Sequence, residues 1–179
     1  MHEDLKEIWF DEDQIQYAVK DLGCTISKDY AGKNLLLVGI LKGCFVFMAD
    51  LVRAITIPCA VDFMSVSSYG SGTKPSGTVR IIKDIDLPLQ NYDVVIIEDI
   101  LDSGNTLSYV KAILSRRNPK SLKLCTMFDK PSRRQVNIQA DYVGYEIADE
   151  FIVGYGLDYN ERYRNLPYVG VLKSEVYSK

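Results

Sequence analysis

The segment Val94–Thr106 constrains the fold more than any other part of the chain. Its first four residues, Val94–Ile97, are all apolar, as are strands buried on both faces of a parallel sheet. The acidic pair Glu98-Asp99 and the polar turn Asp102–Gly104 follow, and apolar residues then recur at helical spacing. A buried strand that leads through a tight turn into a helix is the repeating unit of α/β sheets, whose ligands bind at the carboxyl ends of the strands.

The rest of the chain continues this alternation. Further strands are predicted at Leu35–Ile40, Ile57–Val66, Leu122–Phe128, Tyr142–Tyr145, Phe151–Tyr155 and Tyr168–Leu172, and helices at Asp11–Lys28, at about Phe45–Ala54, and from Thr106 to a close at Arg116–Pro119. The sequence therefore predicts an α/β fold with a mostly parallel sheet flanked by helices. At 179 residues we expect one domain, spanning residues 1–179.

One connection in this pattern is long. Ser67–Thr78 reads SSYGSGTKPSGT, and its glycines, proline and hydroxyl side chains predict a flexible loop. Structureless loops of this length are uncommon in compact domains, and many of them are lids or binding loops.

Composition excludes several classes of protein. The chain has 21 basic and 24 acidic residues and a formal net charge of −3, whereas proteins that neutralise nucleic-acid phosphates are usually basic. Its single histidine, His2, lies at the N-terminus, where chains are usually loose. A Ser–His–Asp mechanism and a zinc site with several histidines are therefore not expected.

The sequence indicates a cytoplasmic protein. The four cysteines form no C-x-x-C pair, and three of them lie in apolar surroundings, which predicts small buried side chains rather than disulfides. The acidic N-terminus does not resemble a secretory signal. The most apolar stretch, Leu35–Val52, is interrupted by Lys42 and Asp50, so no membrane span is predicted.

The turn after the buried strand suits a phosphate group. Free N–H groups at a helix N-terminus bind anions, Gly104 allows close approach, and Ser103 and Thr106 add hydroxyl donors. Glu98 and Asp99 would repel a phosphate, so their presence indicates a ligand that also carries hydroxyl groups or a divalent cation. A ribose 5-phosphate has both features. The alternative is an ordinary strand–turn–helix with Asp102 or Ser103 as the helix cap.

The whole segment Val94–Thr106 resembles the phosphoribosyl-pyrophosphate signature of type I phosphoribosyltransferases. Four more segments resemble the hypoxanthine-(guanine) phosphoribosyltransferases of purine salvage, particularly the bacterial ones: Leu41–Gly43, Ser67–Gly70, Asp129–Arg134 and Val153–Tyr159. The resemblance runs from about Ile8 to Leu172.

This resemblance implies a fold, a reaction and partners. The fold would be the type I phosphoribosyltransferase fold, with a small hood made by terminal segments, partly from about residues 140–179, and a mobile loop at about 67–78. The reaction would transfer ribose 5-phosphate from phosphoribosyl pyrophosphate to N9 of hypoxanthine, or more weakly guanine, with Mg²⁺ as cofactor. The family associates as homodimers or homotetramers, and no membrane or nucleic-acid partner is expected.

The resemblance also implies roles for individual residues. Asp102 would be the general base or the partner of purine N7. Glu98, Asp99 and Asp102–Thr106, which include Ser103, Gly104 and Asn105, would hold the phosphoribosyl group, and Asn105 would contribute backbone only. Pyrophosphate would bind Lys42, Gly43 and Arg164, with a cis peptide between Leu41 and Lys42. The purine would contact Lys130, Phe151 and Ile152. Ser68 and Tyr69 would lie on the lid, and Glu98, Asp99 and Asp158 would be the magnesium ligands.

Other interpretations of the same residues remain open at this stage. Lys42 could extend to the surface from an apolar stretch, Lys130 and Asp158 could lie on solvated turns, and Phe151 could be a core aromatic. A xanthine-preferring transferase would share the same motifs. A nucleotide-sensing regulator that binds RNA or DNA on the same fold would be more basic than this chain.

Overall fold

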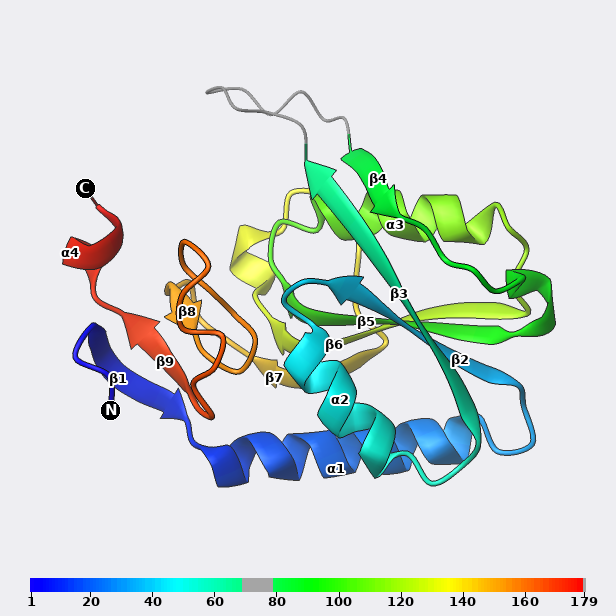
Figure 1. Cartoon of the computed structure of the whole chain (residues 1–179), viewed down its shortest axis with the longest axis horizontal. Helices are drawn as coiled ribbons and strands as arrows, with labels where there is room; N and C mark the ends of the chain where they lie inside the picture. The colour runs from blue at the N-terminus through cyan, green and yellow to red at the C-terminus, as the bar shows by residue number, and fades with distance from the viewer. Residues whose placement is uncertain (69–78, 179) are drawn as a thin grey trace.

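The computed structural model describes residues 1–68 and 79–178 (Figure 1). Its main sheet has six strands in the order β4-β3-β2-β5-β6-β7, and a smaller antiparallel sheet has the order β1-β9-β8. The strands are β1 (Leu5–Phe10), β2 (Leu35–Leu41), β3 (Cys59–Ser68), β4 (Val79–Lys83), β5 (Asp93–Leu101), β6 (Ser121–Asp129), β7 (Tyr142–Glu146), β8 (Ile152–Val153) and β9 (Val169–Leu172). The helices are α1 (Glu12–Asp29), α2 (Phe45–Ala54), α3 (Asn105–Ser115) and α4 (Ser174–Tyr177).

The main sheet is parallel except at one edge. Strands β3, β2, β5, β6 and β7 pair in parallel, whereas β4 pairs antiparallel with β3. The carboxyl ends of the parallel strands therefore lie along one edge of the sheet, as the repeating strand–turn–helix pattern predicts. The prediction of an α/β fold with a mostly parallel sheet is confirmed.

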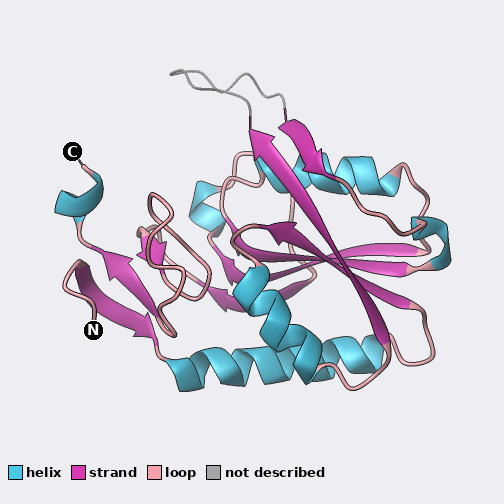
Figure 2. Cartoon of the chain, viewed as in Figure 1, coloured by secondary structure: helices cyan, strands magenta, loops and turns pink. Residues whose placement is uncertain are grey.

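Helices cover both faces of this sheet (Figure 2). Alternate residues of β2 point to opposite sides: Leu35 and Leu37 join the core beneath α1 and α2, and Leu36 and Val38 join the core beneath α3. All four side chains are essentially inaccessible to solvent. This double burial explains why the central strands are apolar at every position rather than at alternate ones.

Local signals set the first helix. Asp11 is its N-cap and accepts a hydrogen bond from the Gln14 amide at 2.8 Å, while Gln14 Oε1 accepts one from the Asp11 amide at 3.0 Å. This reciprocal pair is a capping box, which satisfies two amides that would otherwise lack partners. The prediction from Asp11 to Lys28 therefore differs from α1 by one residue at each end.

The smaller sheet brings together the two ends of the chain (Figure 1). Strand β1 pairs with β9, and β9 pairs with β8. Leu5, Val153, Tyr163 and Leu172 form a separate apolar core beneath it. We call this sheet together with α4 the hood.

Several expectations about the chain were wrong. The N-terminus is not loose: the His2 amide donates to Tyr168 Oη at 3.0 Å, and β1 fills an edge position beside β9. Strand β3 runs through Ser67 and Ser68, two residues into the predicted loop, because antiparallel pairing with β4 extends it. Strand β5 continues to Leu101 because β6 pairs with it that far. β8 is only two residues long, and β4 and α4 were not predicted.

The described residues contain no helix long and apolar enough to cross a membrane. Cys44 and Cys125 are buried, Cys59 is half-buried and Cys24 is exposed, and all four are free thiols. Burial raises the pKa of the Cys44, Cys59 and Cys125 thiols, so these three side chains behave as small apolar residues.

Candidate active site

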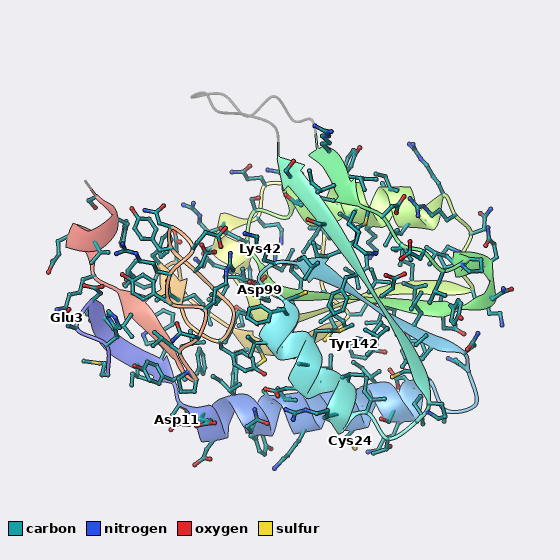
Figure 3. All side chains as sticks on the ribbon, viewed as in Figure 1. Glu3, Asp11, Cys24, Lys42, Asp99 and Tyr142 are labelled. Carbon is teal, nitrogen blue, oxygen red and sulfur yellow. The ribbon has the colours of Figure 1, made fainter. Side chains whose placement is uncertain are left out.

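The candidate site lies where the carboxyl ends of β2, β5 and β6 face the hood. Lys42 follows β2, Asp102 follows β5, and Lys130 follows β6. Figure 3 labels Lys42 and Asp99 in this region, between the main sheet and the hood. Residues far apart in the sequence therefore meet at the edge where α/β sheets bind ligands.

The turn after β5 presents backbone amides. Gly104 occupies the N-cap position of α3 with a φ of +82°, a left-handed conformation that favours glycine. A Cβ atom there would also lie 2.5 Å from Ile138 Cγ2. The N-cap is Gly104 rather than Asp102 or Ser103 of the alternative interpretation, and Ser103 Oγ accepts a long hydrogen bond of 3.4 Å from the Asn105 amide. The Thr106 and Leu107 amides have no partner among the described residues and therefore remain available to a ligand.

Side chains and backbone of the loop after β6 hydrogen-bond to this turn and support it. Arg134 donates to the Leu101 carbonyl at 2.9 Å, to the Asp102 carbonyl, and to the Asp129 carboxylate. The Gln135 amide donates to the Ser103 carbonyl at 3.0 Å. The Asn105 side chain donates to Gln135 Oε1 at 2.7 Å, which also supports the turn. These bonds fix the backbone that carries Asp102 without using its carboxylate.

The acidic pair occupies the end of β5. Asp99 is only 7% exposed, and a Cβ atom on Gly43 would lie 1.8 Å from Asp99 Oδ2. Glycine at position 43 therefore brings the backbone after β2 directly against this carboxylate. Burial, followed by the neighbouring charge of Asp99, holds the pKa of Glu98 well above its usual range. Two crowded carboxylates at this place favour a cation or a hydroxyl-bearing ligand beside them.

Two cationic side chains, Lys42 after β2 and Arg164 in the segment before β9, also belong to this region. Lys42 follows a cis peptide bond with Leu41, as the resemblance implies, and its Nζ lies 2.7 Å from Glu161 Oε1. Arg164 donates to the Gly156 carbonyl at 2.7 Å and lies 2.8 Å from Asp158 Oδ1. Lys42 is exposed at the surface, whereas Arg164 is largely buried by the turn that carries Asp158.

The loop after β6 and the strand β8 line the opposite side of the site. Lys130 is 6% exposed, which excludes an ordinary solvated turn, and its Nζ donates to the Glu150 carbonyl at 2.8 Å. Phe151 is 37% exposed and is therefore not a core aromatic. Its ring stacks on Tyr177 of α4 at a centroid distance of 4.9 Å. An ammonium group and an exposed aromatic face suit a planar polar ring.

Two cavities meet at this site. The larger, of about 510 Å³, is lined by Asp99, Ile100, Asp102, Lys130, Arg133, Asp149, Glu150, Phe151, Ile152, Leu157, Asp158 and Tyr177. The smaller, of about 250 Å³, is lined by Ile40–Gly43, Val66, Glu98, Ile100, Asp102–Gly104, Thr106 and Leu107. Among the residues that the structure describes, only Ile100 and Asp102 line both. These two residues form the boundary between the cavities. The larger cavity is lined by aromatic and basic side chains, and the smaller one is lined by the turn between β5 and α3.

Asp102 has an unusual environment at this boundary. Its side chain is 45% exposed, but its Oδ1 atom is buried and accepts no hydrogen bond from the described residues. Arg133 Nε forms an ion pair with this oxygen at 3.6 Å. A carboxylate oxygen without a donor is costly unless a ligand supplies one.

The structure places most of the predicted site residues around the two cavities. Glu98, Asp99, Asp102–Gly104, Thr106, Lys42, Gly43, Lys130, Phe151, Ile152 and Asp158 line one or both. Arg164 reaches them through Asp158, and Asn105 is exposed at the start of α3. Ser68 ends β3. Tyr69 and the rest of the predicted lid, residues 69–78, lie outside the described residues.

Sequence reasoning missed other residues of the site. Arg133 and Arg134 belong to the segment Asp129–Arg134, which resembles the family, so the sequence did contain a signal for them although no role was predicted. The sequence contained no signal for Tyr177 or Glu161. Each of them reaches the site only because of how the hood packs on the rest of the protein. Ile100 reads as a buried strand residue and gave no indication that it borders both cavities.

A substitution at Gly156 tests how closely the segment after β8 packs against the turn after β2. It has a φ of +99°, and a Cβ atom would lie 2.2 Å from the Gly43 carbonyl oxygen. We expect Gly156→Ala to lower the free energy of unfolding by about 2–5 kcal/mol, since backbone strain and overpacking add. Urea denaturation measures this. The control is Gly32→Ala, with a φ of +73° and no neighbour within 4 Å, which should lose only about 1–2 kcal/mol. Equal losses would contradict the predicted clash.

The fold and the site together define an α/β protein of the phosphoribosyltransferase type. Residues 10–160 match the phosphoribosyl transferase domain. The chain is 54% identical over 178 residues to a hypoxanthine-guanine phosphoribosyltransferase from Staphylococcus aureus, covering 99% of both sequences. A crystal structure of a hypoxanthine phosphoribosyltransferase from the same species matches 100% of this chain and 97% of its own, with 54% identity and a TM-score of 0.96.

A second kind of relative is much longer. The bifunctional protein TilS/HprT of Listeria monocytogenes is 51% identical over 179 residues, but the chain spans only 28% of its length. From the domain match and the full-length similarity, the chain belongs to the phosphoribosyl transferase family, and the hypoxanthine-guanine phosphoribosyltransferases are its similar relatives.

Proposed function

We propose that this protein transfers ribose 5-phosphate from phosphoribosyl pyrophosphate to N9 of a 6-oxopurine, hypoxanthine first and guanine second. The observation that carries the proposal is that Asp102 and Ile100 border both cavities. The larger cavity suits the base and the smaller one suits the ribose phosphate. A bond between the two substrates would then form beside the Asp102 carboxylate.

The base would lie against Phe151 and Leu157, with Lys130 donating to its 6-oxo group. Lys130 is a buried cation whose only close acceptors among the described residues are the Glu150 carbonyl and, at 3.8 Å, Asp149. Ile152, at the start of β8, would contribute its backbone to the edge of the ring. Adenine carries an amino group at the 6 position, so a lysine donor would select against it.

The ribose phosphate would lie over the turn after β5. The amides at the start of α3, with Ser103 and Thr106, would bind the 5-phosphate. Glu98 and Asp99 would face the ribose hydroxyl groups. Lys42, Gly43 and Arg164 would bind the pyrophosphate, and their positive charge would stabilise the negative charge that develops as it leaves.

Asp102 would have one of two roles. Its carboxylate would accept the proton that the purine loses, or it would be the hydrogen-bond partner of purine N7. Its Oδ1 atom accepts no hydrogen bond from the described residues, and a ring N–H would supply one. Arg134 holds the Asp102 backbone in place through its carbonyl, and the carboxylate borders both cavities.

Magnesium fits the donor set of this site. Mg²⁺ usually takes one or two carboxylates and completes its shell with water and substrate phosphates, and Glu98, Asp99 and Asp158 offer such carboxylates. Within residues 1–68 and 79–178, no three histidine, cysteine or acidic side chains form a metal cluster. The ion would neutralise charge on the pyrophosphate, which would supply its remaining ligands.

A direct assay tests the proposed function. The protein is mixed with phosphoribosyl pyrophosphate, Mg²⁺ and one base at a time, and nucleotide formation is followed by ultraviolet absorbance. We expect fast conversion of hypoxanthine, slower conversion of guanine, and none of adenine. Xanthine as the best substrate would overturn the base preference. No product with any base would overturn the activity and favour a nucleotide-sensing regulator.

Lys130→Ala tests the base site. We expect the KM for hypoxanthine to rise roughly 10–100-fold, the range for a lost hydrogen bond to a charged group, while the KM for phosphoribosyl pyrophosphate changes much less. Steady-state kinetics with each substrate varied in turn measures both. Lys20→Ala, on the exposed face of α1, is the control for lost charge. Equal losses for both substrates would mean that Lys130 is not in the base site.

A further inference from the structure

Glu161 bridges the two cationic side chains beside the smaller cavity. Its Oε1 atom lies 2.7 Å from Lys42 Nζ. Its Oε2 atom lies 3.2 Å from Arg164 Nη2 and 3.4 Å from Arg164 Nε. Lys42 comes from the end of β2 and Arg164 from the hood, so one carboxylate joins the two halves of the site. Nothing in the sequence singled out Glu161.

The local backbone holds Glu161 in this position. Asn160 and Glu161 both have left-handed conformations, with φ values of 50° and 61°. The Glu161 amide donates to Asp158 Oδ2 at 2.8 Å, and Tyr159 and Arg162 exchange backbone hydrogen bonds across the turn. The turn therefore presents the Glu161 side chain to the cations rather than leaving it free on the surface.

The two cations depend on Glu161 to different degrees. Arg164 is also held by the Gly156 carbonyl at 2.7 Å and by Asp158 at 2.8 Å. Lys42 makes no ion pair other than that with Glu161 among the described residues. Loss of Glu161 would thus leave Arg164 in place and free the Lys42 ammonium group.

A carboxylate with one oxygen on each cation matches what a bridging pyrophosphate requires. We propose that Glu161 is a placeholder anion, which pairs with Lys42 and Arg164 when no pyrophosphate is bound and must be displaced when pyrophosphate binds. This rests on the proposed function, because it takes Lys42 and Arg164 as the pyrophosphate cations. Glu161 then weakens the binding of pyrophosphate and promotes its release as product.

Charge and exposure make this exchange feasible. Hydrogen bonds from Lys42 and Arg164 lower the pKa of Glu161, so its carboxylate is ionised at neutral pH. The Lys42 and Glu161 side chains are 67% and 63% exposed. Exposed ion pairs are weak, so pyrophosphate with its larger charge can replace Glu161, and the effect of the competition is about two- to fivefold in affinity.

Two variants separate occupancy from simple repulsion. Glu161→Gln removes the charge, whereas Glu161→Asp keeps the charge on a side chain one methylene shorter, which cannot span both cations. The binding of magnesium pyrophosphate to the full-length protein is measured by isothermal titration calorimetry, together with the KM for hypoxanthine. Glu146→Gln is the control, because Glu146 is exposed on β7 and lines neither cavity.

We expect both Glu161 variants to bind magnesium pyrophosphate about two- to fivefold more tightly, with an unchanged KM for hypoxanthine. Unchanged or weaker binding in both variants would overturn the proposal. Tighter binding in Glu161→Gln alone, or equal tightening in Glu146→Gln, would replace it with long-range repulsion. Nucleotide formation by the unsubstituted protein tests the proposed function separately. If no nucleotide formed, the calorimetric comparison of pyrophosphate binding between the variants could still be interpreted.

Discussion

Asp102→Asn should lower the turnover number by about 10²–10⁴-fold, the range for loss of a general base. Asparagine has nearly the same shape as aspartate but cannot accept a proton at neutral pH. The backbone of residue 102 is held by Arg134 through its carbonyl, so the substitution should leave the turn in place. The measurement is the turnover number at saturating concentrations of both substrates.

The position of Asp102 makes this prediction specific. Its Oδ1 atom accepts no hydrogen bond from residues 1–68 and 79–178, and its side chain borders both cavities. Asp21→Asn, on the exposed surface of α1, makes the same change of charge away from the site and should keep full turnover. A loss of less than tenfold in Asp102→Asn, or a loss confined to the KM of the base, would favour a contact with purine N7 over proton transfer.

Removal of divalent cations should reduce nucleotide formation by more than roughly a hundredfold, since a metal ion can supply several kcal/mol of charge stabilisation. Glu98 and Asp99 are consecutive residues near the end of β5. Without a cation, these carboxylates would repel the phosphates of the substrate. The measurement is the rate in EDTA, followed by recovery when MgCl₂ is added in excess.

A second readout separates this effect from damage to the protein. Two or three carboxylates are too few to hold Mg²⁺ without substrate, so the melting temperature of the protein alone should be the same in EDTA and in MgCl₂. Phosphoribosyl pyrophosphate should raise the melting temperature much more when Mg²⁺ is present. Full activity without any divalent cation would contradict the magnesium assignment.

Much of the fold could be predicted because its signals are local. The apolar runs of β2 and β5, the periodicity of α1 and α3, and the turn before α3 each depend on residues close together in the sequence. The predicted range of α2, Phe45–Ala54, equals the observed one. Where prediction failed, pairing with a distant strand was decisive: β1 exists because β9 offers it an edge, and β3 is longer because β4 pairs with it.

Some residues of the candidate site could likewise be predicted from the sequence, and others could not. Strand order brings Lys42, Asp102 and Lys130 together, because each follows a parallel strand, and the sequence alone could place them at one edge of the sheet. The roles of Tyr177 and Glu161 could not be predicted. Tyr177 reaches Phe151 only when α4 packs on the hood, and Glu161 reaches Lys42 only when the hood closes against the turn after β2.

The sequence by itself determined the strand–turn–helix units, the buried central strands and the chemistry available after each strand, because these depend on neighbouring residues and on burial. The tertiary structure alone decided which side chains share a cavity, that Asp102 and Ile100 border two of them, and that the site's cations carry an internal anion. These features arise from contacts between segments that are distant in the sequence; Lys42 and Glu161, for example, are 119 residues apart. Such contacts depend on how the hood packs on the sheet, and no local pattern encodes that packing.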